Sequence, residues 1–169
     1  MKNRVKTALG AITLMPALLA ISLAGATDVV TTKLMTLELA HDIAQGAIDA
    51  CRKGGYQVSV VVTDRSGEPL VVMRDVYSNK FFTQLAHGKA NAVVLSSTSS
   101  GALRNNRSDI VNELNHLEGV LVLAGGLPIE TAGSIIGAVG VSGAPAADKD
   151  EACAQHGIDA VQERLDFAD

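Results

Sequence analysis

The segment from Gly125 to Gly143 most constrains what this chain can fold into. Its first part, Gly-Gly-Leu-Pro-Ile-Glu at 125–130, joins two glycines to a proline, a combination that predicts a turn. Its second part, 135–143, is a run of small and apolar residues that predicts a strand containing Gly137 and Gly140. Because glycine weakens the interior of a strand, we expect another backbone, a helix or a ligand to approach these two positions closely.

The first 26 residues have the three parts of an export signal in order. Lys2, Arg4 and Lys6 form a basic start, residues 8–23 are uncharged and mostly apolar, and Ala-Gly-Ala at 24–26 has the form of a cleavage site. The apolar run is shorter than the roughly 20 residues that span a bilayer, although an uncleaved anchor is the alternative. We therefore expect cleavage after residue 26 and a periplasmic or secreted protein.

Removal of this signal makes the chain more acidic. All 18 acidic residues follow position 26, whereas three of the 14 basic residues precede it, so residues 27–169 carry a formal charge of −7. That charge argues against nucleic-acid binding, which requires clustered Lys and Arg, and no polybasic segment is present for anionic lipid. The length and the lack of repeats predict one domain over 27–169, with no membrane span in the mature form.

The residue pattern predicts an α+β fold in the order α-β-β-α-(α)-β-β-α. Thr36 is placed to cap the first helix, and Gly54 and Gly55 are placed to end it. The other expected elements are strands 56–63 and 69–74 joined by a turn, a helix at 79–95, a polar loop at 96–106, a short helix at 109–116, strands 119–124 and 134–142, and a helix at 148–165. Because short turns join consecutive strands, we expect antiparallel pairing.

Several motifs, in this order along the chain, resemble the GlcG/HbpS family of haem-degrading proteins. They are V-V-T-D-x-x-G-x-x-L at 61–70, M-R-D at 73–75, A-x-x-K-A at 86–90, G-G-L-P-I at 125–129, G-A-V-G-V-S-G at 137–143 and a D-E-x-C-A-x-x-G segment ending at 157. The resemblance covers roughly 34–166. It implies a profilin-like antiparallel sheet flanked by helices, and self-association into dimers or octamers. It also implies haem as the ligand, with corrinoids and glycolate-type operons as the other associations of the family.

The common catalytic motifs are absent from the sequence. It has no G-x-S-x-G, H-E-x-x-H, phosphate loop or C-x-x-C, and the glycines of 137–143 lie within a predicted strand instead of between a strand and a helix. Any chemistry would therefore come from a bound cofactor, with the protein supplying position and environment.

The four histidines are the candidate metal ligands. We predict His87 as the ligand or substrate contact, because Gly88 beside it disfavours a helix by about 1 kcal/mol and so indicates a close approach. His41 is expected to be packed on the first helix, and His116 to be solvated in a loop. His156 departs from the family's C-A-x-A-G pattern, so it either crowds the last helix or adds a ligand.

The predicted cofactor-binding residues are Arg74, His87, Lys89 and Thr98. Arg74 either pairs with Asp75 or grips a ligand carboxylate through two parallel hydrogen bonds. Since residues two apart point about 200° from each other on a helix, we expect Lys89 to be site scaffold and His87 to be the contact.

Ala92 and Thr98 bear on haem directly. The resemblance implies K-A-x-T-A in the second helix, but Ala92 stands in the threonine position and cannot form a side-chain hydrogen bond. Thr98, which follows the helix, is expected to keep a related contact.

Cys51 and Cys153 are the only cysteines. Export permits a disulfide between them, and burial as two separate small apolar residues is the alternative. The scarcity of large side chains favours stabilisation through subunit contacts.

Three functions remain open from the sequence. The first is an exported haem-binding protein with haem-degrading activity. The second is an enzyme or accessory protein for a small hydroxy acid or aldehyde, in which Arg74 grips the carboxylate and His87 or Lys89 moves a proton. The third is a ligand-free oligomeric interaction protein.

Overall fold

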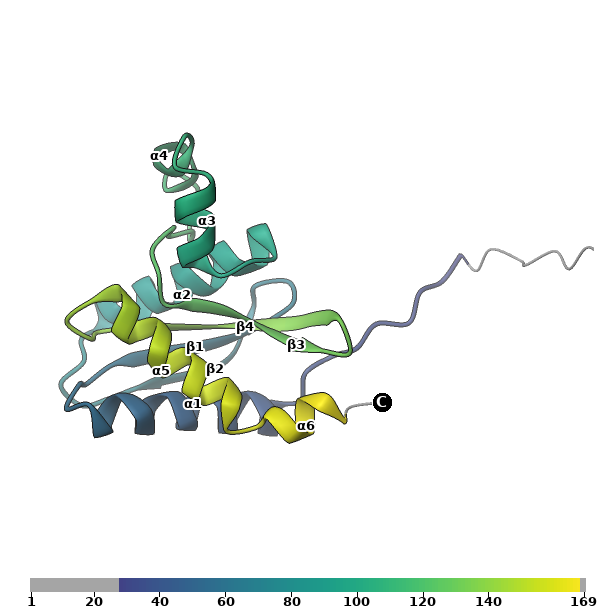
Figure 1. Ribbon diagram of the computed structural model, residues 1–169, viewed down its shortest axis with the longest axis horizontal. Coiled ribbons are helices and arrows are strands. Elements are labelled where there is room, and N and C mark those ends of the chain that lie inside the picture. The colour runs from purple at the N-terminus through teal and green to yellow at the C-terminus, as the bar shows by residue number, and fades with distance from the viewer. Residues whose placement is uncertain (1–27, 168–169) are drawn as a thin grey trace, which may run out of the picture. The chain divides into compact units, whose positions relative to one another are not determined.

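The chain folds around one four-stranded antiparallel sheet of order β2-β1-β4-β3, with helices on both faces (Figure 1). The computed structural model describes residues 28–167, so the predicted signal peptide at 1–26 lies outside the described residues. The α+β class and the element order agree with the prediction. The strands are β1 (Ser59–Asp64), β2 (Pro69–Arg74), β3 (Gly126–Thr131) and β4 (Ser134–Ser142), and the helices are α1 (Leu37–Lys53), α2 (Lys80–Ser96), α3 (Ser100–Asn106), α4 (Val111–Leu114), α5 (Ala147–Asp159) and α6 (Gln162–Asp166).

Helices α1 and α5 cover one face of the sheet and enclose the main core. Thr36 caps α1 as predicted, its side-chain oxygen accepting from the Leu39 amide at 3.2 Å, and Gly54 ends the helix. The buried face of α1 packs on alternate residues of the strands, because side chains alternate between the two faces of a sheet. This core includes Ile43, Ala47, Ile48, Val60, Val62, Ile129, Val139 and Val141.

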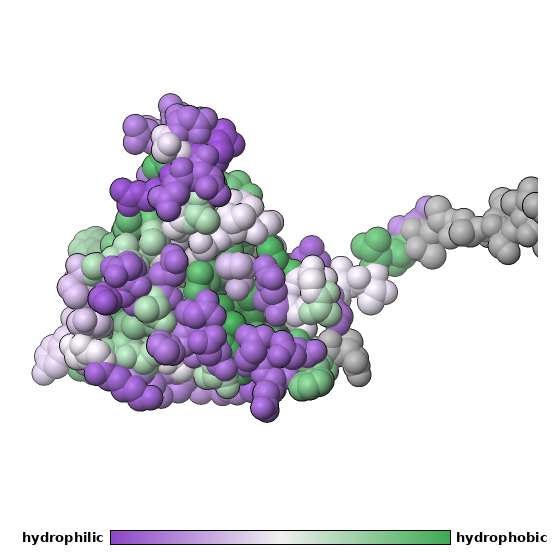
Figure 2. Space-filling model, viewed as in Figure 1, coloured by the Kyte–Doolittle hydropathy of each residue, from purple (hydrophilic) through white to green (hydrophobic). Residues whose placement is uncertain are grey.

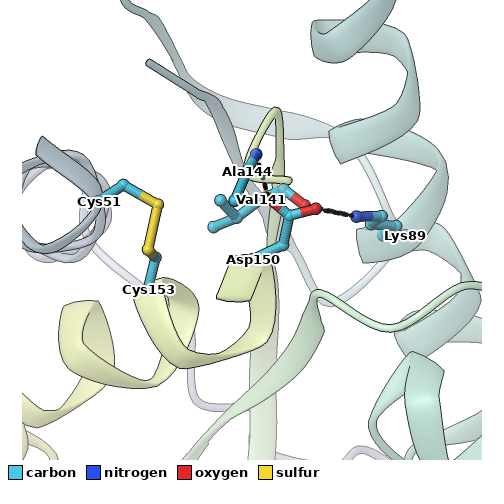
Figure 3. The surroundings of a disulfide bond; sticks show 6 residues. All are labelled: Cys51, Lys89, Val141, Ala144, Asp150 and Cys153. Carbon is cyan, nitrogen blue, oxygen red and sulfur yellow. Dashed lines mark hydrogen bonds and ion pairs between the residues drawn. A yellow bond between two sulfur atoms is a disulfide. The ribbon is translucent and has the colours of Figure 1, made fainter. Parts of the chain in front are cut away.

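A disulfide between Cys51 and Cys153 joins α1 to α5 (Figure 3). The two Cα atoms are 5.4 Å apart, and both residues are buried. Of the two interpretations left open by the sequence, the structure has the disulfide. The two helices are also close at Gly157, where an added Cβ would lie 2.4 Å from the Ile43 carbonyl oxygen.

Helix α2 lies on the opposite face, directly over Gly140 of β4. A Cβ at Gly140 would lie 1.9 Å from the carbonyl oxygen of Ala86, and one at Gly126 would lie 2.4 Å from that of Lys89. A Cβ at Gly137 would lie 2.2 Å from the carbonyl oxygen of Thr63 in β1. The expectation that backbone approaches the strand glycines closely is therefore confirmed.

The predicted turn at 125–130 and the predicted strand at 119–124 are both wrong. The third strand is Gly126–Thr131, and it pairs with β4 from the edge of the sheet. An edge strand tolerates Pro128 because one of its sides needs no ladder hydrogen bond. The turn lies at Ala132 and Gly133, whose φ angles of 45° and 74° give the two-residue hairpin loop that matches strand twist.

The predicted polar loop at 96–106 is also wrong over its second half, which forms α3. Ser99 caps this helix, its hydroxyl oxygen accepting from the Ala102 amide at 3.1 Å. Serine thus starts a helix here, although its abundance suggested a loop. The short α4 falls within the predicted 109–116 helix; none of its residues is buried, and hydrophilic side chains cover this tip of the molecule (Figure 2).

The single helix predicted at 148–165 is broken into α5 and α6. The break lies at Ala160 and Val161. The Thr131 hydroxyl donates to the Leu165 carbonyl at 2.6 Å and so holds α6 against β3. This contact depends on residues 34 positions apart, which the local pattern does not report.

Candidate functional site

A groove lies between α2 and the edge strand β2. Helix α2 packs mainly on β4 and β1 and leaves the neighbouring face of β2 largely uncovered. The groove has a volume of about 380 Å³. Its lining residues are Val61, Pro69, Val72, Arg74, Lys80, Thr83, Gln84 and His87.

His87, the predicted contact residue, is partly buried and lines this groove. Its Nε2 atom is 3.1 Å from the carbonyl oxygen of Gly67, in the turn between β1 and β2. The hairpin turn and helix α2 therefore fix the ring together.

Arg74 lines the same groove, but it does not pair with the Asp75 carboxylate. Its guanidinium donates to the backbone carbonyls of Asp75, at 3.3 Å, and of Ser78. The buried Asp75 carboxylate instead accepts from Arg52 Nε at 2.9 Å. The predicted Arg74–Asp75 ion pair is wrong because Arg52, on α1, reaches the carboxylate across 23 positions of sequence.

Lys89 points away from the groove, into the protein. Its ammonium group is 1% exposed and donates to the Asp150 carboxylate at 2.7 Å and to the Val141 carbonyl at 2.9 Å (Figure 3). Burial lowers the pKa of Lys89 and raises the pKa of Asp150. Lys89 thus connects α2 to the end of β4 and to α5, in agreement with the expectation that it and His87 face different ways.

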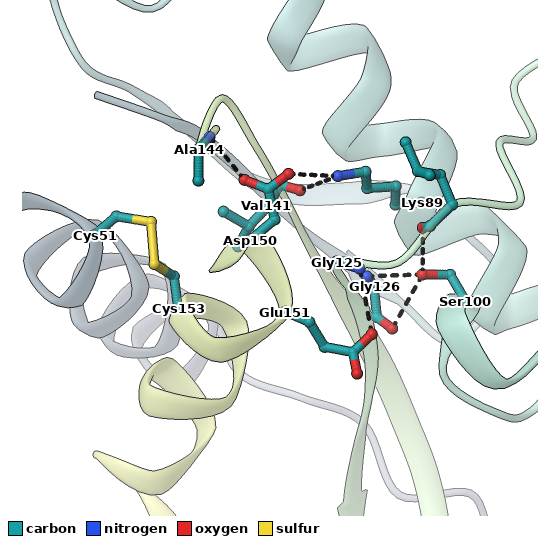
Figure 4. A network of polar contacts seen from close by, with 11 residues as sticks. Cys51, Lys89, Ser100, Gly125, Gly126, Val141, Ala144, Asp150, Glu151 and Cys153 are labelled. Atoms are coloured by element: carbon teal, nitrogen blue, oxygen red, sulfur yellow. Dashed lines mark hydrogen bonds and ion pairs between the residues drawn. A yellow bond between two sulfur atoms is a disulfide. The ribbon is translucent and has the colours of Figure 1, made fainter. Parts of the chain in front are cut away.

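The start of β3 completes this polar network (Figure 4). The Ser100 hydroxyl donates to the Leu123 carbonyl at 2.7 Å and accepts from the Gly126 amide at 2.8 Å. The Glu151 carboxylate accepts from the Gly125 amide at 3.4 Å. These contacts hold the loop that enters β3, and no part of them lines the groove.

Thr98 lies beyond the end of α2, in a second groove of about 380 Å³. Its hydroxyl is 3.2 Å from that of Ser96, and its neighbours in this groove include Leu103, Arg107 and Leu114. The structure therefore brings Arg74 and His87 together in one groove and places Lys89 and Thr98 elsewhere. Ala92, in the position of the family threonine, is buried against Leu103 and Val122.

Three groove residues of α2 were not predicted from the sequence, namely Lys80, Thr83 and Gln84, and neither were the three apolar residues contributed by β1 and β2. Together with His87, the three residues of α2 follow the i, i+3, i+4, i+7 spacing that places residues on one side of a helix. That spacing could have identified the groove-facing side of α2 once His87 was chosen.

The remaining histidines lie outside this groove. His41 is exposed, with its Nδ1 3.4 Å from the Asp42 carboxylate, so the prediction that it packs on the first helix is wrong. His116 is exposed in the segment after α4, as predicted. His156 is exposed on α5, so it does not crowd the helix. Within residues 28–167, no three His, Cys, Asp or Glu side chains gather as a metal site.

The close approach indicated by Gly88 comes from the protein's own backbone. An added Cβ would lie 2.9 Å from the Leu121 side chain, and the Leu121 amide donates to the Gly88 carbonyl at 2.9 Å. This glycine is therefore explained by packing of the loop before β3.

A family model described as haem-degrading protein HbpS-like matches residues 35–159. The chain belongs to the HbpS-like family. No curated protein matches the sequence.

Solved structures of the HbpS-like fold agree with this assignment. A crystal structure of HbpS is 32% identical, covers 82% of this chain and 97% of its own, and superposes with a TM-score of 0.74. A double mutant of HbpS from Streptomyces reticuli is 31% identical, with coverage of 82% and 94% and a TM-score of 0.72. PduOC, solved as a haem complex, is 26% identical, with coverage of 76% and 95% and a TM-score of 0.68.

Among residues 28–167, no helix is long and apolar enough to cross a membrane.

Proposed function

We propose that this protein is an exported haem-binding protein and that the groove between α2 and β2 holds haem. The observation that carries the proposal is the composition of the groove, in which Arg74, Lys80 and His87 surround an apolar floor and no acidic side chain lines the site. Membership of the HbpS-like family supports the ligand class, as does the relative solved as a haem complex.

The residues present fit an amphipathic metal-bearing ring. Pro69 and Val72 offer apolar surface to a flat macrocycle, with the fully buried Val61 beneath them. Arg74 and Lys80 offer positive charge to its carboxylates, and His87 offers an imidazole, a common axial ligand of haem iron.

The size of the groove indicates how much of the ligand it covers. About 380 Å³ lies near the lower end of the roughly 300–1,000 Å³ typical of small-molecule sites. A groove of this size would cover only part of a tetrapyrrole ring.

With an external oxidant such as dioxygen or peroxide, the iron of bound haem would supply the chemistry for slow breakdown of the ring. The protein's contribution would be to orient the ring through Arg74 and Lys80 and to offer the His87 imidazole, which the Gly67 carbonyl holds in place. The rival interpretation, chemistry on a small hydroxy acid, loses Lys89 as the group that moves a proton, because Lys89 is buried against Asp150 and does not line the groove. Arg74 and His87 line the groove and suit either ligand, so the family match and the relative solved as a haem complex are what favour haem.

Export is part of the proposal. The basic start, apolar run and Ala-Gly-Ala site at the N-terminus motivate it. The Cys51–Cys153 disulfide supports it, because disulfides persist in oxidising compartments. N-terminal sequencing of protein from cell fractions tests it: a mature start at or near Thr27 is expected, and an intact Met1 in the cytoplasm would refute export.

Self-association into at least a dimer is also part of the proposal. Strand β2 is an edge of the sheet, and the segment between β2 and α2, outside the groove, leaves Val76 81% and Tyr77 86% exposed. A second copy covering this surface would remove apolar area and a free strand edge from water. Sedimentation at micromolar concentration should show at least a dimer, and a stable monomer would contradict this part.

Haem titration of the purified protein tests the ligand. A saturable, shifted Soret band is expected, and the Arg74→Ala/Lys80→Ala double variant should bind about tenfold more weakly, as expected for loss of charge-assisted contacts. Lys149→Ala, which removes an exposed lysine of α5, is the matched control and should bind like wild type. Absence of a saturable shift in the wild-type protein would overturn the proposal.

A further inference from the structure

The contact between His87 and Gly67 determines which nitrogen of the imidazole is free. Nε2 lies 3.1 Å from the Gly67 carbonyl oxygen, and a carbonyl can only accept a hydrogen bond. Nε2 therefore carries the proton, and in the neutral ring the lone pair is on Nδ1. No contact of Nδ1 with another group occurs in the described part of the chain.

The position of the Gly67 carbonyl is set by Asp64. One carboxylate oxygen of Asp64 accepts from the Ser66 amide at 2.8 Å, the Ser66 hydroxyl at 2.7 Å and the Glu68 amide at 3.0 Å. The bond from the Ser66 side chain lowers the pKa of Asp64, so the group is an ionised acceptor at neutral pH. Gly67 itself has φ of 95°, in the left-handed region.

The geometry points to Asp64 as a positioning residue that, through the Gly67 carbonyl, holds His87 as the Nε2–H tautomer and presents Nδ1 as the coordinating nitrogen of the groove. The inference rests on the proposed function for the identity of the ligand, a haem or another metal-bearing tetrapyrrole. Histidines that bind metals commonly donate their other N–H to a carbonyl or carboxylate in this way.

The rest of the groove offers no competing nitrogen. Arg74 and Lys80 are cations without a free lone pair at neutral pH, and an amide nitrogen such as that of Gln84 is a donor only. The Thr83 hydroxyl donates to Ser59 at 3.0 Å. Coordination by this face of α2 therefore depends on His87 and on the group that sets its tautomer.

The tautomer can be measured in the ligand-free protein. In a long-range ¹H–¹⁵N correlation spectrum, His87 should show a protonated Nε2 and an unprotonated Nδ1, with His87→Ala used to assign the signals. A protonated Nδ1 in the wild-type protein would overturn the inference, whatever the result with haem.

Coordination is measured by titration with haem and with iron-free protoporphyrin. Asp64→Ala and His87→Ala should each weaken haem binding about tenfold, the lower end of the effect of lost supporting partners, and should change the Soret band. Binding of the iron-free ring should change by less than about threefold, since no coordinating bond is lost. Asp64→Asn keeps the accepting side-chain oxygen and should restore nearly wild-type haem affinity and spectrum.

The outcomes separate the two proposals. Wild-type haem affinity and spectrum in both Asp64→Ala and His87→Ala would overturn the positioning role while leaving haem binding intact. An equal loss of haem and of the iron-free ring would also overturn it, because packing and not coordination would then be responsible. If wild-type protein binds no haem, the proposed function and the coordinating role of Nδ1 both fail, and the ligand-free spectrum still decides the tautomer.

Discussion

The ammonium nitrogen of Lys89 lies 2.7 Å from a carboxylate oxygen of Asp150, and neither side chain is more than 5% exposed. Lys89 belongs to α2 and Asp150 to α5, so the ion pair joins helices from opposite faces of the sheet at the end of β4 (Figure 4). The other carboxylate oxygen of Asp150 accepts from the Ala144 amide at 2.9 Å. Each charge is thus desolvated and depends on its partner.

Replacing one residue of this pair should destabilise the protein more than replacing both. Asp150→Asn should lower the free energy of unfolding by about 3–5 kcal/mol, because it leaves the Lys89 charge buried and uncompensated. The Lys89→Met/Asp150→Asn double variant should be less destabilised than the single one. Urea unfolding measures both.

Asp148→Asn is the matched control for this pair, since Asp148 lies in the first turn of the same helix and its side chain is 74% exposed. We expect a change within about 0.5 kcal/mol. If Asp150→Asn and Asp148→Asn were equally stable, the assigned role of the buried Lys89–Asp150 pair would be contradicted.

The disulfide should contribute strongly to stability. It closes a loop of 102 residues, and removing a native disulfide typically costs about 2–5 kcal/mol. The Cys51→Ala/Cys153→Ala variant should therefore unfold at lower urea concentration than wild type, and reductant should shift the wild-type transition but not that of the variant. Alkylation of both cysteines in denatured, unreduced wild-type protein would show that the bond is absent.

Gly140→Ala should be strongly destabilising. The new methyl would lie 1.9 Å from the Ala86 carbonyl oxygen, which is backbone and cannot rotate away. We expect a loss of about 3 kcal/mol or more, at the upper end of overpacking effects. Ser134→Ala, at the exposed start of the same strand, should change stability by less than about 0.5 kcal/mol. A Gly140→Ala variant as stable as wild type would place α2 further from the sheet.

The Asp42–Arg164 pair should make a small pH-dependent contribution. The hydrogen bond from Arg164, on α6, lowers the pKa of Asp42 from its ordinary 3.8. A depressed folded-state pKa stabilises the fold above the unfolded-state value, and this stabilisation is lost as pH falls through the folded-state value. Asp42→Asn should therefore be less stable than wild type near about pH 6 and equal to it at low pH.

The effect of salt checks whether the Asp42–Arg164 pair is responsible for this stability difference. Both side chains are about half exposed, so roughly 1 M salt should also remove most of the difference at neutral pH. A difference between Asp42→Asn and wild type that grows as the pH falls would contradict the sign.

The local elements could be predicted where one residue type has one structural effect. Thr36 caps α1 and Gly54 ends it, both as predicted. The spacing of the small residues indicated close backbone contacts at Gly137 and Gly140. The turn predicted around Pro128 was wrong because proline is tolerated in a strand at the edge of a sheet. Which strand lies at the edge depends on the tertiary structure.

The site could be predicted only in part, for a similar reason. Arg74 was predicted from a family motif and His87 from the glycine beside it, and the two share a groove. Helical geometry predicted that Lys89 and His87 point in different directions, as they do. However, the partner of Asp75 is Arg52 and that of Lys89 is Asp150, which lie 23 and 61 positions away. Charge alone cannot choose among many candidate partners at such separations.

The sequence by itself determined the α+β class, the ends of the first two helices, the family and the small-residue contacts, because these depend on local conformation or on motifs. Only the tertiary structure decided the edge position of β3, the Cys51–Cys153 bond, the burial of Lys89 and the free nitrogen of His87. Each of these depends on which distant segment packs against the residue, since burial and hydrogen-bond partners are properties of the folded chain.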